Sequence, residues 1–121
     1  MKNKKENFGF VRVAAVSPRL KVGDPRFNVD EMLKWLKTAE KQDIALVVFP
    51  EMGISGNTVA DLHFQKTLQN ATQKELLRFV RASKNSSAAS VIGFALPYEG
   101  KLFNVAALIC GGNILGIVPK T

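Results

Sequence analysis

The stretch that decides the fold is Ala-Leu-Val-Val-Phe-Pro-Glu, residues 45–51. Its first five residues are apolar and do not alternate with polar ones, so they predict a strand that is covered on both faces. Pro50 has no backbone N–H to donate and ends that strand. Glu51 then lies at the carboxyl end, the edge where open α/β sheets bind their ligands. We therefore expect a buried strand with a carboxylate at its mouth.

The same arrangement of apolar strand, proline and charge occurs again at residues 114–120. There Pro119 ends the strand and Lys120 follows it. If the two strands are neighbours and point the same way, Glu51 and Lys120 converge in one crevice. Such a pair could accept a proton and stabilise an oxyanion. A solvated rim or a structural ion pair would look the same in the sequence, so both interpretations stay open.

Two amphipathic helices are expected between and after the first strands. Apolar residues at helical spacing predict a helix over 29–41, and Asn28 with Glu31 has the spacing of a capping box at its start. A second helix is expected to begin at Thr72, which stands at the same spacing from Glu75. Both helices should cover a sheet with their apolar sides.

The remaining apolar runs predict strands at 10–16, 91–96, 102–110 and 114–118. The last three are joined by short turns that contain glycine, which is typical of an antiparallel meander. Strands and helices that alternate before passing into a meander indicate an α/β fold with a mixed sheet.

Composition limits the class of protein. The chain has 121 residues, 46% of them hydrophobic, which suffices for one domain and excludes general disorder. The single cysteine, Cys110, excludes an internal disulfide framework and a zinc finger, and no metal site is expected. The uncharged stretch 102–119 contains Asn104 and two consecutive glycines, so two strands suit it better than a membrane span. We expect a cytoplasmic protein without a membrane partner.

The net charge of +7 raises a different class of function, nucleic-acid binding. The lysines are scattered over helix faces and the N-terminus without interleaved aromatic residues, so a solvated surface is the better interpretation and no nucleic-acid partner is expected. A third possibility is a non-catalytic scaffold, because uncovered sheet faces favour association.

A serine nucleophile and a phosphate site find little support. Residues 53–57, Gly-Ile-Ser-Gly-Asn, begin like a nucleophile elbow, but Asn57 replaces the required last glycine, and His63 follows too soon. No glycine-rich phosphate loop is present, so no nucleotide cofactor is expected to bind these residues.

Several motifs together resemble a known family. The first set is FPE at 49–51, GIS at 53–55, LFNVA at 102–106 and GIVPK at 116–120. In this order they resemble the nitrilase superfamily of carbon–nitrogen hydrolases. A second set comprises residues 9–16, residues 22–28, Asp61, Leu62 and Gln65. These resemble more narrowly the glutaminase domain of glutamine-dependent NAD synthetases. The resemblance spans almost the entire chain.

The resemblance implies a four-layer α-β-β-α sandwich, of which residues 1–121 would be the N-terminal portion, with no second domain present. It also implies a Glu-Lys-Cys triad in which Glu51 matches the general base and Lys120 the oxyanion-stabilising lysine. Glutamine, or another small amide, would be the substrate, and this step needs no cofactor. ATP and nicotinic acid adenine dinucleotide would belong to a synthetase domain that receives the ammonia. The complete enzyme is expected to be a homo-oligomer.

The sequence departs from the family at the nucleophile. The family's cysteine comes well after the lysine, whereas Cys110 precedes Lys120 inside an apolar strand and does not match it. No nucleophile is therefore expected within residues 1–121, and the isolated chain should be inactive because a thiolate must form the acyl-enzyme. Asn57 stands where relatives often carry an aromatic residue, which leaves another nitrilase-type amidase open as an alternative.

Overall fold

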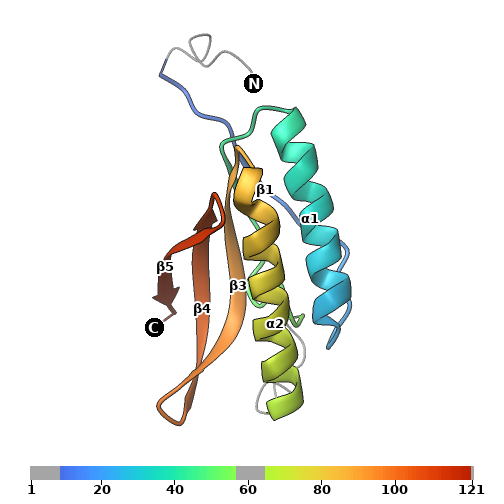
Figure 1. The fold of residues 1–121 in the computed structure, drawn as a ribbon, viewed down its shortest axis with the longest axis vertical. Coiled ribbons are helices and arrows are strands. Elements are labelled where there is room, and N and C mark those ends of the chain that lie inside the picture. Colours follow the sequence, from blue (N-terminus) through green and yellow to red (C-terminus); the bar gives the residue numbers. More distant parts are fainter. Residues whose placement is uncertain (1–8, 57–64, 121) are drawn as a thin grey trace.

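The computed structural model describes residues 9–56 and 65–120 of the 121-residue chain. Within them the elements follow the order β1 (Val13–Ala15), α1 (Pro25–Lys41), β2 (Leu46–Val48), α2 (Lys66–Ala82), the 3-10 turn η3 (Ser83–Asn85), β3 (Ala89–Tyr98), β4 (Lys101–Cys110) and β5 (Asn113–Pro119) (Figure 1). The predicted order of strands and helices is confirmed.

The strands form one mixed sheet in the order β1-β2-β3-β4-β5. β1, β2 and β3 are parallel, and β4 and β5 are each antiparallel to the strand before them. Helices connect the parallel strands, as such crossovers require. The two later connections are tight turns in which Glu99, Gly100, Gly111 and Gly112 all have positive φ angles, the backbone that two-residue hairpin loops need.

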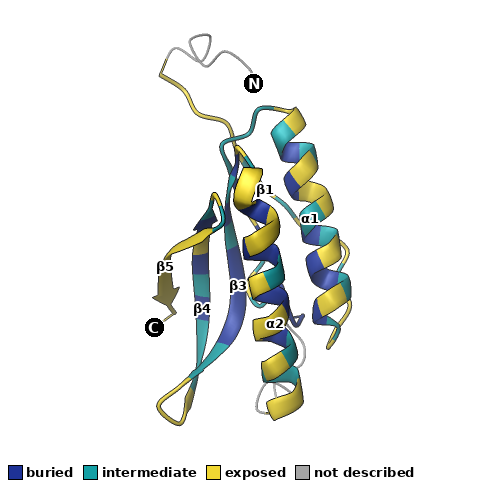
Figure 2. Ribbon diagram, viewed as in Figure 1, coloured by how far each residue is buried: buried dark blue, intermediate teal, exposed yellow. Residues whose placement is uncertain are grey.

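Both helices cover the same face of this sheet (Figures 1 and 2). The core between them contains Val29, Met32, Leu36, Val47, Leu76, Phe79, Ile92, Phe94, Val105, Ala107 and Ile109. Phe49 and Phe79 meet edge to face with ring centroids 6.1 Å apart. This two-layer packing makes the sheet a rigid base for the residues at its edge.

Neither helix covers the opposite face of the sheet, where the turn after β2 lies against Gly93. Val47 of β2 is fully buried, but its neighbour Val48 points to the other side and is 38% exposed. Val13 and Val118 are more exposed still. The prediction that the strand at 45–49 is covered on both faces is therefore wrong within the described residues, because both helices pack on the Val47 side.

Both predicted capping boxes are also wrong. α1 begins at Pro25, capped by Asp24, whose carboxylate accepts a hydrogen bond from the N–H of Phe27 at 3.1 Å. Asn28 therefore lies within the first turn and does not cap it. The spacing of three residues that marks a capping box also occurs inside any helix, so it does not fix where a helix starts.

In α2, the predicted cap residues lie in the helix interior. The helix begins at Lys66, and both Thr72 and Glu75 are buried. Glu75 accepts a hydrogen bond from Arg78 at 2.6 Å, and Arg78 also reaches Asp30 of α1 at 2.6 Å. Arg78 thus joins the two helices, and Glu75 holds its guanidinium group in place.

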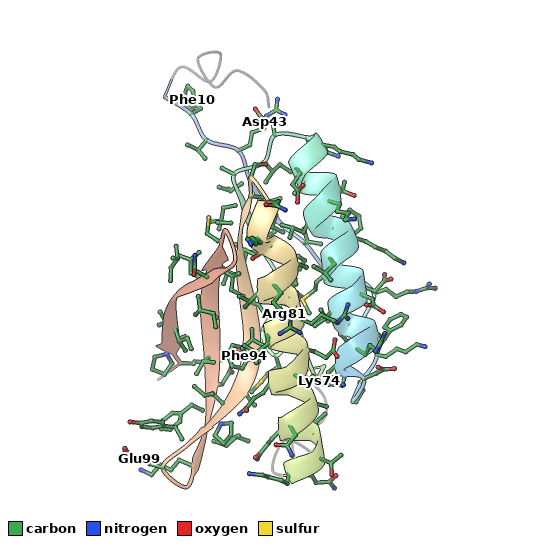
Figure 3. The ribbon with its side chains drawn as sticks, viewed as in Figure 1. Phe10, Asp43, Lys74, Arg81, Phe94 and Glu99 are labelled. Carbon is green, nitrogen blue, oxygen red and sulfur yellow. The ribbon has the colours of Figure 1, made fainter. Side chains whose placement is uncertain are left out.

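The first strand is shorter than the predicted 10–16. Only Val13–Ala15 pair with β2, which is itself three residues long, and Phe10 is 80% exposed (Figure 3). The length of β1 is set by the short strand β2 with which it pairs, and the sequence of residues 10–16 does not show how long that partner is. None of the helices in the described parts of the chain is both long and apolar enough to cross a lipid bilayer.

Candidate functional site

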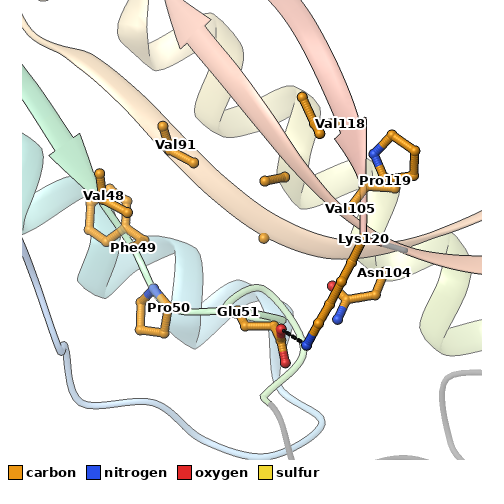
Figure 4. A pocket seen from close by; sticks show the side chains of 12 residues that line it. Val48, Phe49, Pro50, Glu51, Val91, Asn104, Val105, Val118, Pro119 and Lys120 are labelled. Carbon is orange, nitrogen blue, oxygen red and sulfur yellow. Dashed lines mark hydrogen bonds and ion pairs between the residues drawn. The ribbon is translucent and has the colours of Figure 1, made fainter.

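Glu51 and Lys120 meet at one edge of the sheet. Glu51 lies in the turn after β2, and Lys120 follows the last residue of β5. The Nζ atom of Lys120 donates a hydrogen bond to Oε2 of Glu51 at 2.8 Å (Figure 4). The predicted convergence of these two residues is confirmed.

The reason given for that convergence is only half right. β2 and β5 do point the same way, but β3 and β4 lie between them. Three strand spacings amount to about 14 Å, more than a glutamate and a lysine comfortably bridge within the sheet. The turn after β2 must therefore carry Glu51 across the neighbouring strand.

Gly93 in β3 makes this crossing possible. A Cβ atom at Gly93 would lie 2.7 Å from the amide nitrogen of Met52 and 2.9 Å from the carbonyl oxygen of Pro50. The turn is fastened there, because the N–H of Ile54 donates to the carbonyl of Gly93 at 3.3 Å. Gly93 was not predicted as a site residue, although an isolated glycine within an apolar strand often marks a close approach of backbone.

We expect Gly93→Ala to destabilise the chain by roughly 1–3 kcal/mol, the usual range for overpacking a filled site. The added methyl group would push against the backbone of the turn and displace Glu51. Urea unfolding followed by circular dichroism measures the change. Gly116→Ala in β5 is the matched control, since a Cβ there meets no atom within 4 Å. Equal unfolding midpoints for the two variants would contradict the crossing argument.

Asn28 holds the other side of the turn. Its side chain is fully buried, with Oδ1 accepting from the N–H of Lys21 at 2.6 Å. Its Nδ2 donates to the carbonyls of Lys21 at 2.8 Å and of Ile54 at 2.9 Å. One side chain thus joins the start of α1, the loop before it and the turn that carries Glu51. Asn28 was predicted to cap the helix, and this bridging role was not predicted.

A cleft of about 320 Å³ is lined by both Glu51 and Lys120. Its walls are mostly apolar, with Val48, Val91 and Val118 among them, and Glu51, Asn104 and Lys120 supply the polar side chains (Figure 4). This volume lies at the lower end of the range for ligand sites. The cleft therefore suits a small molecule with a polar group at one end.

The environment keeps Glu51 ionised. The hydrogen bond from Lys120 lowers the pKa of Glu51 most, a hydrogen bond from the Asn104 side chain lowers it further, and the charge of Lys120 adds to both. Partial desolvation opposes them. Because the Lys120 and Glu51 side chains are 64% and 44% exposed, the ion pair adds little to stability. Its main effect is to keep Glu51 in the carboxylate form.

Other candidate nucleophiles are remote or buried. Cys110 lies six residues along β4 from Asn104, roughly 20 Å at the usual rise of a strand. It therefore cannot act with Glu51, as expected. Ser55, the centre of the elbow-like motif, is fully buried in the turn. Asn57, Asp61, Leu62 and His63 lie outside the described residues.

Comparisons with known proteins assign the chain to a family. Residues 12–121 match the carbon–nitrogen hydrolase family. A glutamine-dependent NAD(+) synthetase of Mycobacterium leprae is 35% identical over 113 residues, covering 93% of this chain and 17% of that protein. The chain thus spans about a sixth of the length of this relative.

Solved structures give the same fold. A glutamine-dependent NAD(+) synthetase of Cytophaga hutchinsonii superposes with a TM-score of 0.85 at 17% identity, over 92% of this chain and 19% of that one. An amidase of Nesterenkonia sp. AN1, with acrylamide added to its active-site cysteine, superposes with a TM-score of 0.76 at 20% identity, over 93% and 44% of the two chains. At these identities the likeness shows the fold alone, the nitrilase-type α/β fold that was predicted. Taken with the family match over residues 12–121, it shows that the chain belongs to the carbon–nitrogen hydrolase family.

Proposed function

We propose that residues 1–121 form the first part of a glutamine-hydrolysing domain, of the kind that supplies ammonia for NAD synthesis. The observation that carries the proposal is the Glu51–Lys120 pair, 2.8 Å apart in an otherwise mostly apolar cleft. The 35% identity to a glutamine-dependent NAD(+) synthetase supports glutamine as the amide.

In this reaction Glu51 is the general base. It takes the proton of a cysteine thiol, whose sulfur bonds to the side-chain carbonyl carbon of glutamine. The carbonyl oxygen becomes an oxyanion, which the ammonium of Lys120 stabilises. When the C–N bond breaks, the proton held by Glu51 passes to the nitrogen and ammonia leaves. Water then attacks the thioester, gives its proton to Glu51, and releases glutamate while the thiol is restored.

The thiol must come from outside residues 1–121. Cys110 is the only cysteine in these residues, and it lies too far along β4 from the pair. The Nesterenkonia amidase, whose fold is similar, has an active-site cysteine. We therefore expect a polypeptide of residues 1–121 to bring the base and the lysine but to hydrolyse no glutamine by itself. Ammonia release from glutamine by that purified polypeptide would contradict this assignment.

A chimera tests the proposed function directly. Residues 1–121 replace the segment of the M. leprae enzyme that they match, and glutamate release from glutamine is measured. NAD formation from free ammonia in the same chimera is the internal control for correct folding of the remainder. We expect both activities. A chimera that uses ammonia but hydrolyses neither glutamine nor other small amides would refute the proposal, while hydrolysis of another amide alone would favour the alternative substrate.

The remaining parts of the proposal concern partners and location. ATP and nicotinic acid adenine dinucleotide would bind a separate synthetase domain, the complete enzyme would be a cytoplasmic homo-oligomer, and no membrane or nucleic acid would take part. Lys74 and Arg81 lie exposed on α2, away from the sheet (Figure 3), and Lys34 pairs with Glu31 at 2.8 Å. These positive charges are thus distributed over the helices and do not line the cleft. This distribution supports the interpretation that they form a solvated surface and do not bind nucleic acid.

A further inference from the structure

Asn104 lies beside the two charged residues of the cleft (Figure 4). It pairs with Ala95 of β3, on the sheet face opposite the helices, while its neighbours Phe103 and Val105 pack toward the core. Its side chain lines the cleft together with Glu51 and Lys120 (Figure 4). No other uncharged polar side chain lines this cleft in the described parts of the chain.

The main chain of Asn104 places Lys120. Pro119 pairs with Val105 at the end of β5, and the N–H of Lys120 then donates to the carbonyl of Asn104 at 2.8 Å. The backbone pairing of β5 with β4 therefore extends past the proline to the lysine itself. This bond fixes the direction from which the Lys120 side chain enters the cleft.

The side chain of Asn104 acts on Glu51. Its amide can donate hydrogen bonds without carrying a charge, and its hydrogen bond to the carboxylate lowers the pKa of Glu51 after the larger effect of Lys120. A leucine at this place would leave the carboxylate with Lys120 as its main partner. An aspartate would add a second negative charge, which disfavours ionisation of Glu51.

We infer that Asn104 is a positioning residue for the pair, fixing Lys120 through its carbonyl oxygen and Glu51 through its side-chain amide. This inference rests on the proposed function insofar as Glu51 is the general base. Asn104 lets Glu51 remain a carboxylate even when Lys120 turns toward an oxyanion, since the amide continues to stabilise the negative charge.

The test is a pH titration of the Glu51 carboxyl carbon by NMR in the chain of residues 1–121. We expect the titration midpoint of Glu51 to move to higher pH in Asn104→Ala and further in Asn104→Asp. Asn113→Ala, a loss of the same side chain at the exposed start of β5, is the matched control and should leave the midpoint unchanged. If Asn104 had only a structural role, the Glu51 midpoints would not rise in the order native chain, Asn104→Ala, Asn104→Asp.

Asn104→Asp keeps the shape of the side chain, so the comparison with the native chain holds even if Asn104→Ala unfolds. Identical Glu51 midpoints in the native chain and in Asn104→Asp would overturn the inference. The result is independent of the chimera assay, because the titration needs no turnover. A shifted midpoint together with an inactive chimera would leave Asn104 its positioning role and remove the proposed function.

Discussion

Replacing Glu51 by Gln in the chimera is expected to lower kcat for glutamine hydrolysis by about 10²- to 10⁴-fold, the usual contribution of a general base. Gln has nearly the same shape but cannot take a proton from the thiol. Replacing Lys120 by Met should cost about 10²- to 10³-fold, as loss of an oxyanion donor does. Glutamate release under saturating glutamine measures both effects.

The controls for these variants are Glu99→Gln and Lys101→Met, at the β3–β4 turn and the start of β4. Both residues lie exposed outside the cleft and should leave turnover unchanged. NAD formation from free ammonia should survive in all four variants, because that reaction bypasses the cleft. Native turnover in Glu51→Gln or in Lys120→Met would remove the role assigned to that residue.

Asn28→Ala is expected to lower the free energy of unfolding by about 2–4 kcal/mol. The change removes three hydrogen bonds and leaves the N–H and carbonyl of Lys21 and the carbonyl of Ile54 without this partner. Each polar group left unsatisfied in the interior costs roughly 1–3 kcal/mol, less where water can reach it. Urea unfolding followed by circular dichroism gives the value.

Asn70→Ala controls for the change in helix propensity, since Asn70 occupies an exposed position in α2. It should be neutral or slightly stabilising. Asn28→Asp is a second probe, because it retains an acceptor for Lys21 but cannot donate to the two carbonyls. If Asn28→Ala unfolded at the same urea concentration as Asn70→Ala, the clamp on the Glu51 turn would be disproved.

The Asn28 clamp and the Gly93 crossing explain why an exposed ion pair can hold a defined geometry. The pair itself contributes little to stability, so the backbone must place it. Asn28 in α1 donates a hydrogen bond to the turn after β2, and the missing side chain of Gly93 lets that turn lie against β3. The carbonyl of Asn104 in β4 accepts a hydrogen bond from the N–H of Lys120.

The amino-acid sequence alone determined the order of strands and helices and the two charged residues at strand ends. These features depend on local patterns, because apolar periodicity, proline and glycine act within a few residues. The exact starts of α1 and α2 were missed, since Asn28 and Thr72 have the spacing of caps but lie inside their helices.

Only the tertiary structure decided how Glu51 reaches Lys120. Local sequence does not reveal that β3 and β4 separate β2 from β5, and the crossing at Gly93 follows from that strand order. The same holds for the hydrogen bonds of Asn28 and Asn104. Asn28 bonds to Ile54, 26 residues further along the chain, and Asn104 accepts a bond from Lys120, which follows a different strand. Hydrogen bonds between distant segments depend on how the layers pack, and no pattern of neighbouring residues encodes them.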